Sequence, residues 1–346
     1  YIYMAFAEDP DTTSPTLASS FNAIAYSGNG SSNRTISGMG FQPDLLWIKS
    51  RTSSEQHYLW DSLRGSSKYL HPNMTAAEGT DATTRLKAFL ADGFKLGNEL
   101  AVNGNNETYI SWAFKADDNE PTINTDGSID SIVSANANAG FSIVKYTGTG
   151  SNATVGHGLS QAPEMMIIKD LDNTRDWAVY SKYNTGASGN AGEERLKLNT
   201  TDATTTYAPY WNSTLPTATV FSLGNEGNVN TSAQDYIAYC FTSITGFSKI
   251  GSYSGGSTGS GNVITTGFQP DWIMLKRTDS ADDWTIMDSV RGDSASSRRL
   301  IANTSEVEKT ATSIWYPTST GFYFESTGAS INASGGTYIY MAFKIN

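Results

Sequence analysis

The sequence predicts an all-β protein made of tandem antiparallel β-sandwich repeats that are jelly-roll-like. A short apolar stretch occurs four times, at residues 1–6, 109–114, 236–241 and 338–343. The segments between these copies repeat one order of blocks, which is the signature of an internal repeat. Gly, Ser, Thr and Asn are abundant and long helical periodicity is absent, which favours strands joined by turns.

The recurring stretch, which we call the motif, has six residues rich in aromatic and branched side chains. It is too short for a typical helix and has the right length for a strand. In the last copy, strand alternation puts Ile339, Met341 and Phe343 on one face and Tyr338, Tyr340 and Ala342 on the other. Because neither face is polar, each copy is expected to be a central strand of a sheet that is covered on both sides.

The blocks around the motif define the expected domain boundaries. Each repeat begins with a strand and a Gly-rich turn, continues through a Pro-initiated strand and a second core strand, and closes with the motif. We expect repeat 1 at residues 21–116, repeat 2 at 141–243 and repeat 3 at 244–346. Residues 1–20 are expected to be the last strand of a preceding repeat plus a linker, and 117–140 a linker. The chain is therefore expected to be a piece of a longer array.

A charged block follows the Pro-initiated strand. Asp61 with Arg64, and Asp288 with Arg291, are spaced to form an ion pair that braces a tight turn. The corresponding segment of the middle repeat, residues 177–184, has neither charge. This loss argues against a catalytic site shared by the repeats and favours a structural brace.

Composition excludes several function classes. A net charge of -11 leaves no basic stripe for nucleic acid or an anionic membrane, and no apolar run reaches membrane-spanning length. The single cysteine, Cys240, cannot form an internal disulfide and is expected to be a small buried hydrophobe. His57, His71 and His157 lack metal-ligand spacing. Residues 122–133 superficially resemble a calcium loop but have Thr122 and Val133 at the first and twelfth positions, where carboxylates are needed. We therefore expect no catalytic residues, no metal and no cofactor.

Several blocks of the chain together resemble a known group of proteins. They are residues 40–44, 124–128, 139–158, 288–292 and 333–343. In this order they resemble a repeated domain of tail and other virion structural proteins of marine bacteriophages, over nearly the whole chain. The resemblance implies a non-enzymatic structural or appendage protein at the virion surface or outside the cell, with a role in host attachment. Its implied partners are other virion proteins or copies of itself in a homo-oligomer.

Two alternatives stay open. The first is a lectin-like module that binds host-surface glycans, since aromatic rings recognise sugar faces. Its candidate contacts are Tyr210, Trp211, Trp315 and Tyr316, although these rings equally suit the cover of each sandwich. The second is a self-assembling filament or surface-layer subunit that uses strand addition. The strand that it would donate consists of Tyr1, Ile2, Tyr3, Met4, Ala5 and Phe6.

Overall fold

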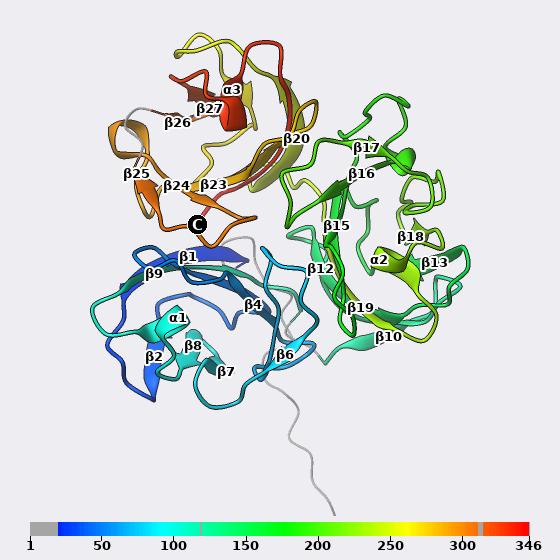
Figure 1. The fold of residues 1–346 in the computed structure, drawn as a ribbon, viewed down its shortest axis with the longest axis horizontal. Helices are drawn as coiled ribbons and strands as arrows, with labels where there is room; N and C mark the ends of the chain where they lie inside the picture. The colour runs from blue at the N-terminus through cyan, green and yellow to red at the C-terminus, as the bar shows by residue number, and fades with distance from the viewer. Residues whose placement is uncertain (1–19, 118–119, 311–313, 346) are drawn as a thin grey trace, which may run out of the picture.

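The computed structural model describes residues 20–117, 120–310 and 314–345, and it is built almost entirely from antiparallel strands. Three lobes surround a common centre (Figure 1). Each lobe has a main sheet and a smaller second sheet, so the expected all-β sandwich class is confirmed. The expected donor strand, residues 1–6, and the linker up to residue 19 lie outside the described residues.

Repeat 1 packs its main sheet against a three-stranded second sheet. The main sheet has the order β1 (Phe21–Ser27), β9 (Thr108–Phe114), β3 (Leu45–Ser50) and β4 (Tyr58–Asp61). The second sheet has the order β2 (Arg34–Ser37), β8 (Gly93–Leu96) and β7 (Leu86–Leu90). A hairpin of β5 (Lys68–Tyr69) and β6 (Gly79–Thr80) and the one-turn helix α1 (Leu100–Asn103) complete the repeat.

Repeat 2 has the largest sheet. Its order is β10 (Thr122–Asn124), β11 (Ser131–Asn136), β12 (Phe141–Thr147), β19 (Asp235–Phe241), β14 (Met165–Asp170), β15 (Ala178–Ser181), β16 (Glu194–Lys197) and β17 (Thr205–Thr206). The second sheet pairs β13 (Ala153–Gly156) with β18 (Val220–Leu223). A 3-10 turn, η2 (Ala191–Glu193), precedes β16, and helix α2 (Gly227–Asn230) precedes β19.

Repeat 3 follows the same plan. Its main sheet has the order β20 (Ser248–Ser254), β28 (Thr337–Phe343), β22 (Trp272–Arg277), β23 (Trp284–Asp288), β24 (Arg298–Ile301) and β25 (Lys309–Thr310). The second sheet has the order β21 (Ile264–Thr265), β27 (Gly321–Phe324) and β26 (Trp315–Thr318). The 3-10 turn η3 (Ser294–Ser296) precedes β24, and helix α3 (Ala329–Asn332) precedes β28.

The segment expected to be a linker, residues 117–140, instead contributes β10 and β11. Strand β11 pairs antiparallel with β12, from Ser131 opposite Tyr146 to Asn136 opposite Phe141. The Asn, Ala and Ser content of this segment suggested a linker, but Ile129 and Val133 are buried in the core of repeat 2. Apolar residues at a few inward positions are sufficient to hold the strand on the sheet.

The motif is the central strand in each main sheet, flanked by the first strand and the Pro-initiated strand of its repeat. Its two faces are both buried, as expected. In repeat 3, Tyr338, Tyr340 and Ala342 face the sandwich core of their own lobe. Ile339, Met341 and Phe343 face a second core that is shared by all three repeats.

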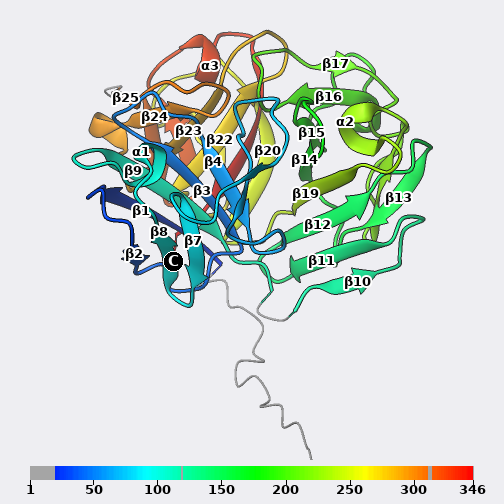
Figure 2. The same cartoon turned by 60° about the horizontal axis from the view of Figure 1, so that its bottom comes forward.

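This shared core joins the repeats into one body. The last residues of the three described motifs, Phe114, Phe241 and Phe343, contact one another pairwise, with ring centroids 5.6, 5.2 and 6.1 Å apart. The three main sheets therefore surround one axis instead of lying end to end (Figure 2). A closed arrangement differs from the row of sandwiches that a fibre of stacked repeats requires.

One backbone hydrogen bond recurs at each boundary between repeats. Glu78 donates from its N–H to the carbonyl of Leu171, Thr204 to that of Thr278, and Glu308 to that of Arg51. Each bond measures 2.9 Å, and each links the segment before β6, β17 or β25 to the end of a Pro-initiated strand in the next repeat. The arrangement is therefore approximately threefold, with repeat 3 closing onto repeat 1. In the described part of the chain, no helix is long and apolar enough to cross a membrane.

Candidate functional site

The boundary between repeats 1 and 2 is closed by a buried ionic network. Arg64 Nε lies 2.7 Å from Asp61 Oδ2, and Arg64 also pairs with Glu78 at 3.1 Å. The ion pair braces the turn after β4, as the sequence predicted. It also reaches the next repeat, because the Tyr239 hydroxyl donates to Asp61 Oδ2 at 2.7 Å. The burial of Tyr239 raises the pKa of its hydroxyl well above 10, so it remains a donor.

The boundary between repeats 3 and 1 has the same network. Arg291 pairs with Asp288 at 2.7 Å and with Glu308 at 3.2 Å. The indole N–H of Trp112 donates to Asp288 Oδ2 at 3.0 Å, in the place that Tyr239 takes at the first boundary. Arg51 of repeat 1 adds a bidentate pair with Glu308, with both distances at 2.9 Å. Such bidentate pairs hold both charges in a fixed geometry.

The boundary between repeats 2 and 3 lacks these charges. Ser181 and Asn184 stand where the other repeats have aspartate and arginine, and Thr204 stands where they have glutamate. The Thr204 hydroxyl donates to Asn184 Oδ1 at 2.5 Å, so a neutral contact replaces the ion pair. Strand register places Met341 at the position of Tyr239 and Trp112, and methionine offers no hydrogen to donate.

A cleft of about 660 Å³ lies at this third boundary. One wall comes from the loop after β15 and from β16 and β17 of repeat 2, and the other from β20, the end of β22 and the start of β28 of repeat 3. The lining is dominated by hydroxyl groups and tyrosine rings. The lining residues are Tyr183, Thr185, Gly186, Ala187, Glu194, Thr204, Thr206, Ser252, Tyr253, Ser254, Thr278, Asp279, Thr337 and Tyr338.

Glu194 is the one buried carboxylate in this lining, with a residue exposure of 1%. Its Oε1 accepts hydrogen bonds from the Ser188 N–H and the Thr206 hydroxyl, both at 2.9 Å. Its Oε2 has no hydrogen-bond partner, which is costly for a buried acceptor. Trp211 supports the segment from behind, because its indole N–H donates to the Glu194 carbonyl at 2.9 Å.

Gly186 brings the loop after β15 against this carboxylate. Its φ of +47° is in the left-handed region. A Cβ at this position would lie 2.3 to 2.5 Å from the Glu194 carboxyl group. The position therefore suits glycine for two reasons, the backbone conformation and the close approach of the side chain.

The second carboxylate of the cleft is already paired. Asp279 lies 2.9 Å from Arg277, and it accepts a hydrogen bond from the Thr337 N–H at 2.8 Å. These contacts, led by the hydrogen bond from Arg277, lower the pKa of Asp279 to about 2. Among the described residues, no lysine or arginine lines the cleft. Glu194 is therefore the lining carboxylate without a cationic partner.

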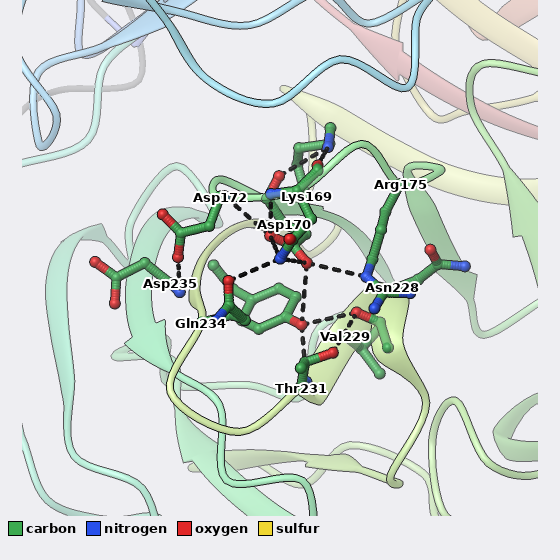
Figure 3. A network of polar contacts seen from close by, with 12 residues as sticks. Lys169, Asp170, Asp172, Arg175, Asn228, Val229, Thr231, Gln234 and Asp235 are labelled. Atoms are coloured by element: carbon green, nitrogen blue, oxygen red, sulfur yellow. Dashed lines mark hydrogen bonds and ion pairs between the residues drawn. The ribbon is translucent and has the colours of Figure 1, made fainter.

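A polar network surrounds Asp170 in repeat 2 (Figure 3). Asp170 accepts hydrogen bonds from the N–H groups of Asp172 and Asn173 and pairs with Arg175 at 3.2 Å. The Tyr236 hydroxyl lies 3.4 Å away and donates to the Gly227 carbonyl at 2.7 Å. The carboxylate is fully engaged in fixing its own loop against α2, so this network is structural.

Three equivalent lysines are buried at the ends of the Pro-initiated strands. Lys49, Lys169 and Lys276 each donate from Nζ to backbone carbonyls, at 2.7 to 3.3 Å. Burial lowers the pKa of each to about 8. None of them lines the cleft, and their bonds hold the loops that follow the strands. Lys276 also donates to the Thr201 carbonyl of repeat 2.

Metal and thiol chemistry find no support in the part of the chain that is described. No group of three or more His, Cys, Asp or Glu residues there is arranged to hold a metal ion. Cys240 is fully buried in the core of repeat 2, which raises the pKa of its thiol to about 12. It is a small core residue, as the sequence indicated.

The candidate glycan contacts from the sequence lie elsewhere. Tyr210, Trp211 and Trp315 are buried in the sandwich cores, with exposures of 0 to 1%. Tyr316 is partly buried and stacks on Tyr323 at 5.0 Å. None of the four lines the cleft, although Trp211 holds the backbone of Glu194 in place.

Sequence reasoning missed Glu194. No motif marks it, and its neighbours in the chain are charged residues of ordinary appearance. The signal that could have pointed to this part of the molecule is the absence of the aspartate and arginine from the middle repeat. It distinguishes repeat 2 from the others, but the facing residues of repeat 3 become evident only in the folded chain.

Comparison with known protein families gives one match. A family model described as a domain of unknown function (DUF7483) covers residues 17–346. The match spans all three repeats. No curated protein matches the chain significantly.

Proposed function

The chain belongs to the DUF7483 family, and we propose that it is a non-enzymatic structural component of a phage virion, exposed on a tail or fibre and able to take part in host attachment. The observation that supports this role most is the closure of the three repeats around one aromatic core. A body cross-linked in this way, with ionic networks at two of its boundaries, suits a rigid building block. The resemblance to virion structural proteins supplies the setting.

Location on the particle is the direct test of this role. Antibodies raised against the chain should label an appendage on purified virions in immunogold electron microscopy. In a density gradient, the protein should be found in the same fractions as intact particles. A chain found only in the soluble fraction of infected cells, with unlabelled particles, would contradict the structural role.

Glycan binding is the second candidate function, and the cleft between repeats 2 and 3 favours it. The walls combine hydroxyl groups, tyrosines and a buried carboxylate, as in many sites that bind small polar ligands. A weak site of this kind gains strength when many copies are displayed on one particle. The third possibility is a self-assembling filament in which residues 1–6 of one subunit add a strand to a sheet of its neighbour. The described residues supply no observation that supports it.

A further inference from the structure

We infer that the cleft between repeats 2 and 3 binds a neutral saccharide, and that Glu194 Oε2 accepts a hydrogen bond from one of its hydroxyl groups. This inference rests on the attachment role proposed above for its biological setting. Its physical basis is independent of that role, since it comes from the shape and chemistry of the cleft.

The first step concerns the unpaired acceptor. Glu194 is 1% exposed, and one of its two carboxylate oxygens has two donors while the other has none. Leaving a buried acceptor unpaired costs free energy, which a ligand with a suitably placed donor would recover. The ligand is therefore expected to bring a hydroxyl or amino hydrogen to Oε2.

The second step concerns charge. Glu194 and Asp279 are the charged groups of the lining. Arg277 offsets Asp279, whereas no lysine or arginine among the described lining residues offsets Glu194. The free chain also has a net charge of -11. Phosphate, sulfate and uronic acid groups would be repelled from such walls. A bare metal ion would lack ligands, because no group of three acidic, histidine or cysteine residues is present in the described chain.

The third step concerns the remaining lining. Thr185, Ser252 and Ser254 supply hydroxyl groups that can both donate and accept. The hydroxyls of Thr204 and Thr206 donate to Asn184 and Glu194, so they can only accept from a ligand. Such groups suit a ligand that is itself a set of hydroxyls. Tyr183 is partly exposed in the cleft, and its ring can pack on the C–H face of a sugar. Tyr253 is stacked on Tyr338, with ring centroids 4.8 Å apart, and packs against the core of repeat 3. The volume of about 660 Å³ is within the range of small-molecule sites and leaves room for one or two sugar rings.

The fourth step concerns the other two boundaries. There, the ion pairs of Arg64 and of Arg291 lie within repeats 1 and 3. They reach the next repeat through the Tyr239 hydroxyl at one boundary and the Trp112 indole at the other. At the third boundary the corresponding residues are short and neutral, and the loop after β15 is longer than its counterparts. The cleft therefore occurs at the one boundary that departs from the threefold arrangement. A function specific to one boundary is expected at such a place.

The test uses the full chain and defined probes. Maltose, lactose and mannobiose are the neutral disaccharides, digalacturonate is the anionic probe, and glucosamine and lysine amide supply ammonium groups. Saturation-transfer NMR identifies binders and isothermal titration calorimetry gives their Kd. We expect at least one neutral disaccharide to bind, and digalacturonate to bind at least ten-fold more weakly.

Variants locate the site. Glu194→Gln should weaken saccharide binding at least ten-fold, whereas Glu193→Gln, the same change at the adjacent residue outside the lining, should leave the Kd unchanged. Ser252→Tyr fills the cleft from an exposed position on the opposite wall and should also abolish binding. Circular dichroism and the thermal midpoint show whether each variant remains folded.

Three results would overturn the inference. The first is that no neutral disaccharide binds. The second is that Glu194→Gln and Ser252→Tyr both bind as tightly as the wild type. The third is that glucosamine and lysine amide bind more tightly than the neutral disaccharides. Unchanged binding by both variants would place a glycan site elsewhere on the chain and leave the attachment role standing. If the antibodies leave virions unlabelled, the proposed virion role fails, but the measured saccharide binding still stands.

Discussion

The hydroxyl of Tyr239 and the carboxylate of Asp61 are hydrogen-bonded at 2.7 Å across the boundary between repeats 1 and 2. Both are fully buried, and they come from strands 178 residues apart in the chain. The indole of Trp112 makes the equivalent contact with Asp288. At the third boundary Met341 replaces the donor, and the aspartate is replaced by Ser181. The residues on the two sides of each boundary thus match one another in polarity.

Removing the carboxylate at the first boundary should strongly destabilise the protein. Asp61→Asn leaves the buried Arg64 guanidinium with only Glu78 as a charged partner, at an expected cost of about 3 kcal/mol. Tyr239→Phe should cost about 1 to 2 kcal/mol, because Asp61 keeps its arginine. Ser181→Ala is the control from the neutral boundary and should cost less than about 1 kcal/mol. Chemical denaturation measures all three, and a cost for Ser181→Ala equal to that of Asp61→Asn would contradict the account.

His57 should make stability depend on pH. Its Nδ1 accepts from the Trp47 indole at 2.9 Å and its Nε2 faces the Ile301 carbonyl at 3.0 Å, so the neutral ring with hydrogen on Nε2 fits both partners. Burial lowers its pKa well below 6.5. The unfolded chain therefore takes up a proton below pH 6.5 that the folded chain refuses, and stability falls as the pH falls.

The comparison for this prediction is His57→Gln, whose amide can make both hydrogen bonds without titrating. Relative to this variant, the wild type should lose up to about 1.4 kcal/mol per pH unit between pH 6.5 and 5. Using the difference removes the shared contribution of Asp44, whose burial raises its pKa to about 6. Parallel stability curves for the two proteins would contradict the assignment.

The buried lysines predict a trend at alkaline pH. Burial lowers the pKa of Lys276 to about 8, while an unfolded lysine titrates near 10.4. Above pH 8 the folded lysine loses its charge before the unfolded one, so the wild type should gain stability relative to Lys276→Met. The gain between pH 7.5 and 10.5 is expected to be about 3 kcal/mol. A difference between the two proteins that does not change with pH would show that the ammonium is not penalised by burial.

Two glycines of one loop give a matched pair of variants near the cleft. Gly186 and Gly189 both have positive φ, of +47° and +76°. A Cβ at Gly189 would meet nothing within 4 Å, whereas one at Gly186 would meet the Glu194 carboxylate. Gly189→Ala should cost about 1 to 2 kcal/mol from backbone strain alone. Gly186→Ala should cost measurably more in the same denaturation assay, and equal costs would show that the carboxylate moves aside freely.

Much of each lobe followed from the sequence. The alternation within the motif correctly predicted a central strand with two apolar faces, because strand periodicity fixes which side chains share a face. The brace between Asp61 and Arg64 was predicted from spacing alone. Both predictions concern residues close together in the chain, where local geometry decides the outcome.

The arrangement of the lobes did not follow from the sequence. The inward face of the motif indicates burial but does not name the residues that cover it, so Phe114, Phe241 and Phe343 gave no sign that they would meet. The strand β11 was missed because half of its six residues, Ser131, Ser134 and Asn136, are polar. Glu194 was missed because the cleft forms only when repeat 3 packs against repeat 2.

The central claim is that the three repeats fold as one body around the shared core, and differential scanning calorimetry of the wild type and Phe114→Ala tests it most directly. We expect a single transition whose calorimetric and van't Hoff enthalpies agree. Phe114→Ala should move that whole transition to lower temperature, at a cost of about 3 to 5 kcal/mol. Separate transitions for the repeats, with Phe114→Ala moving only one of them, would contradict the claim.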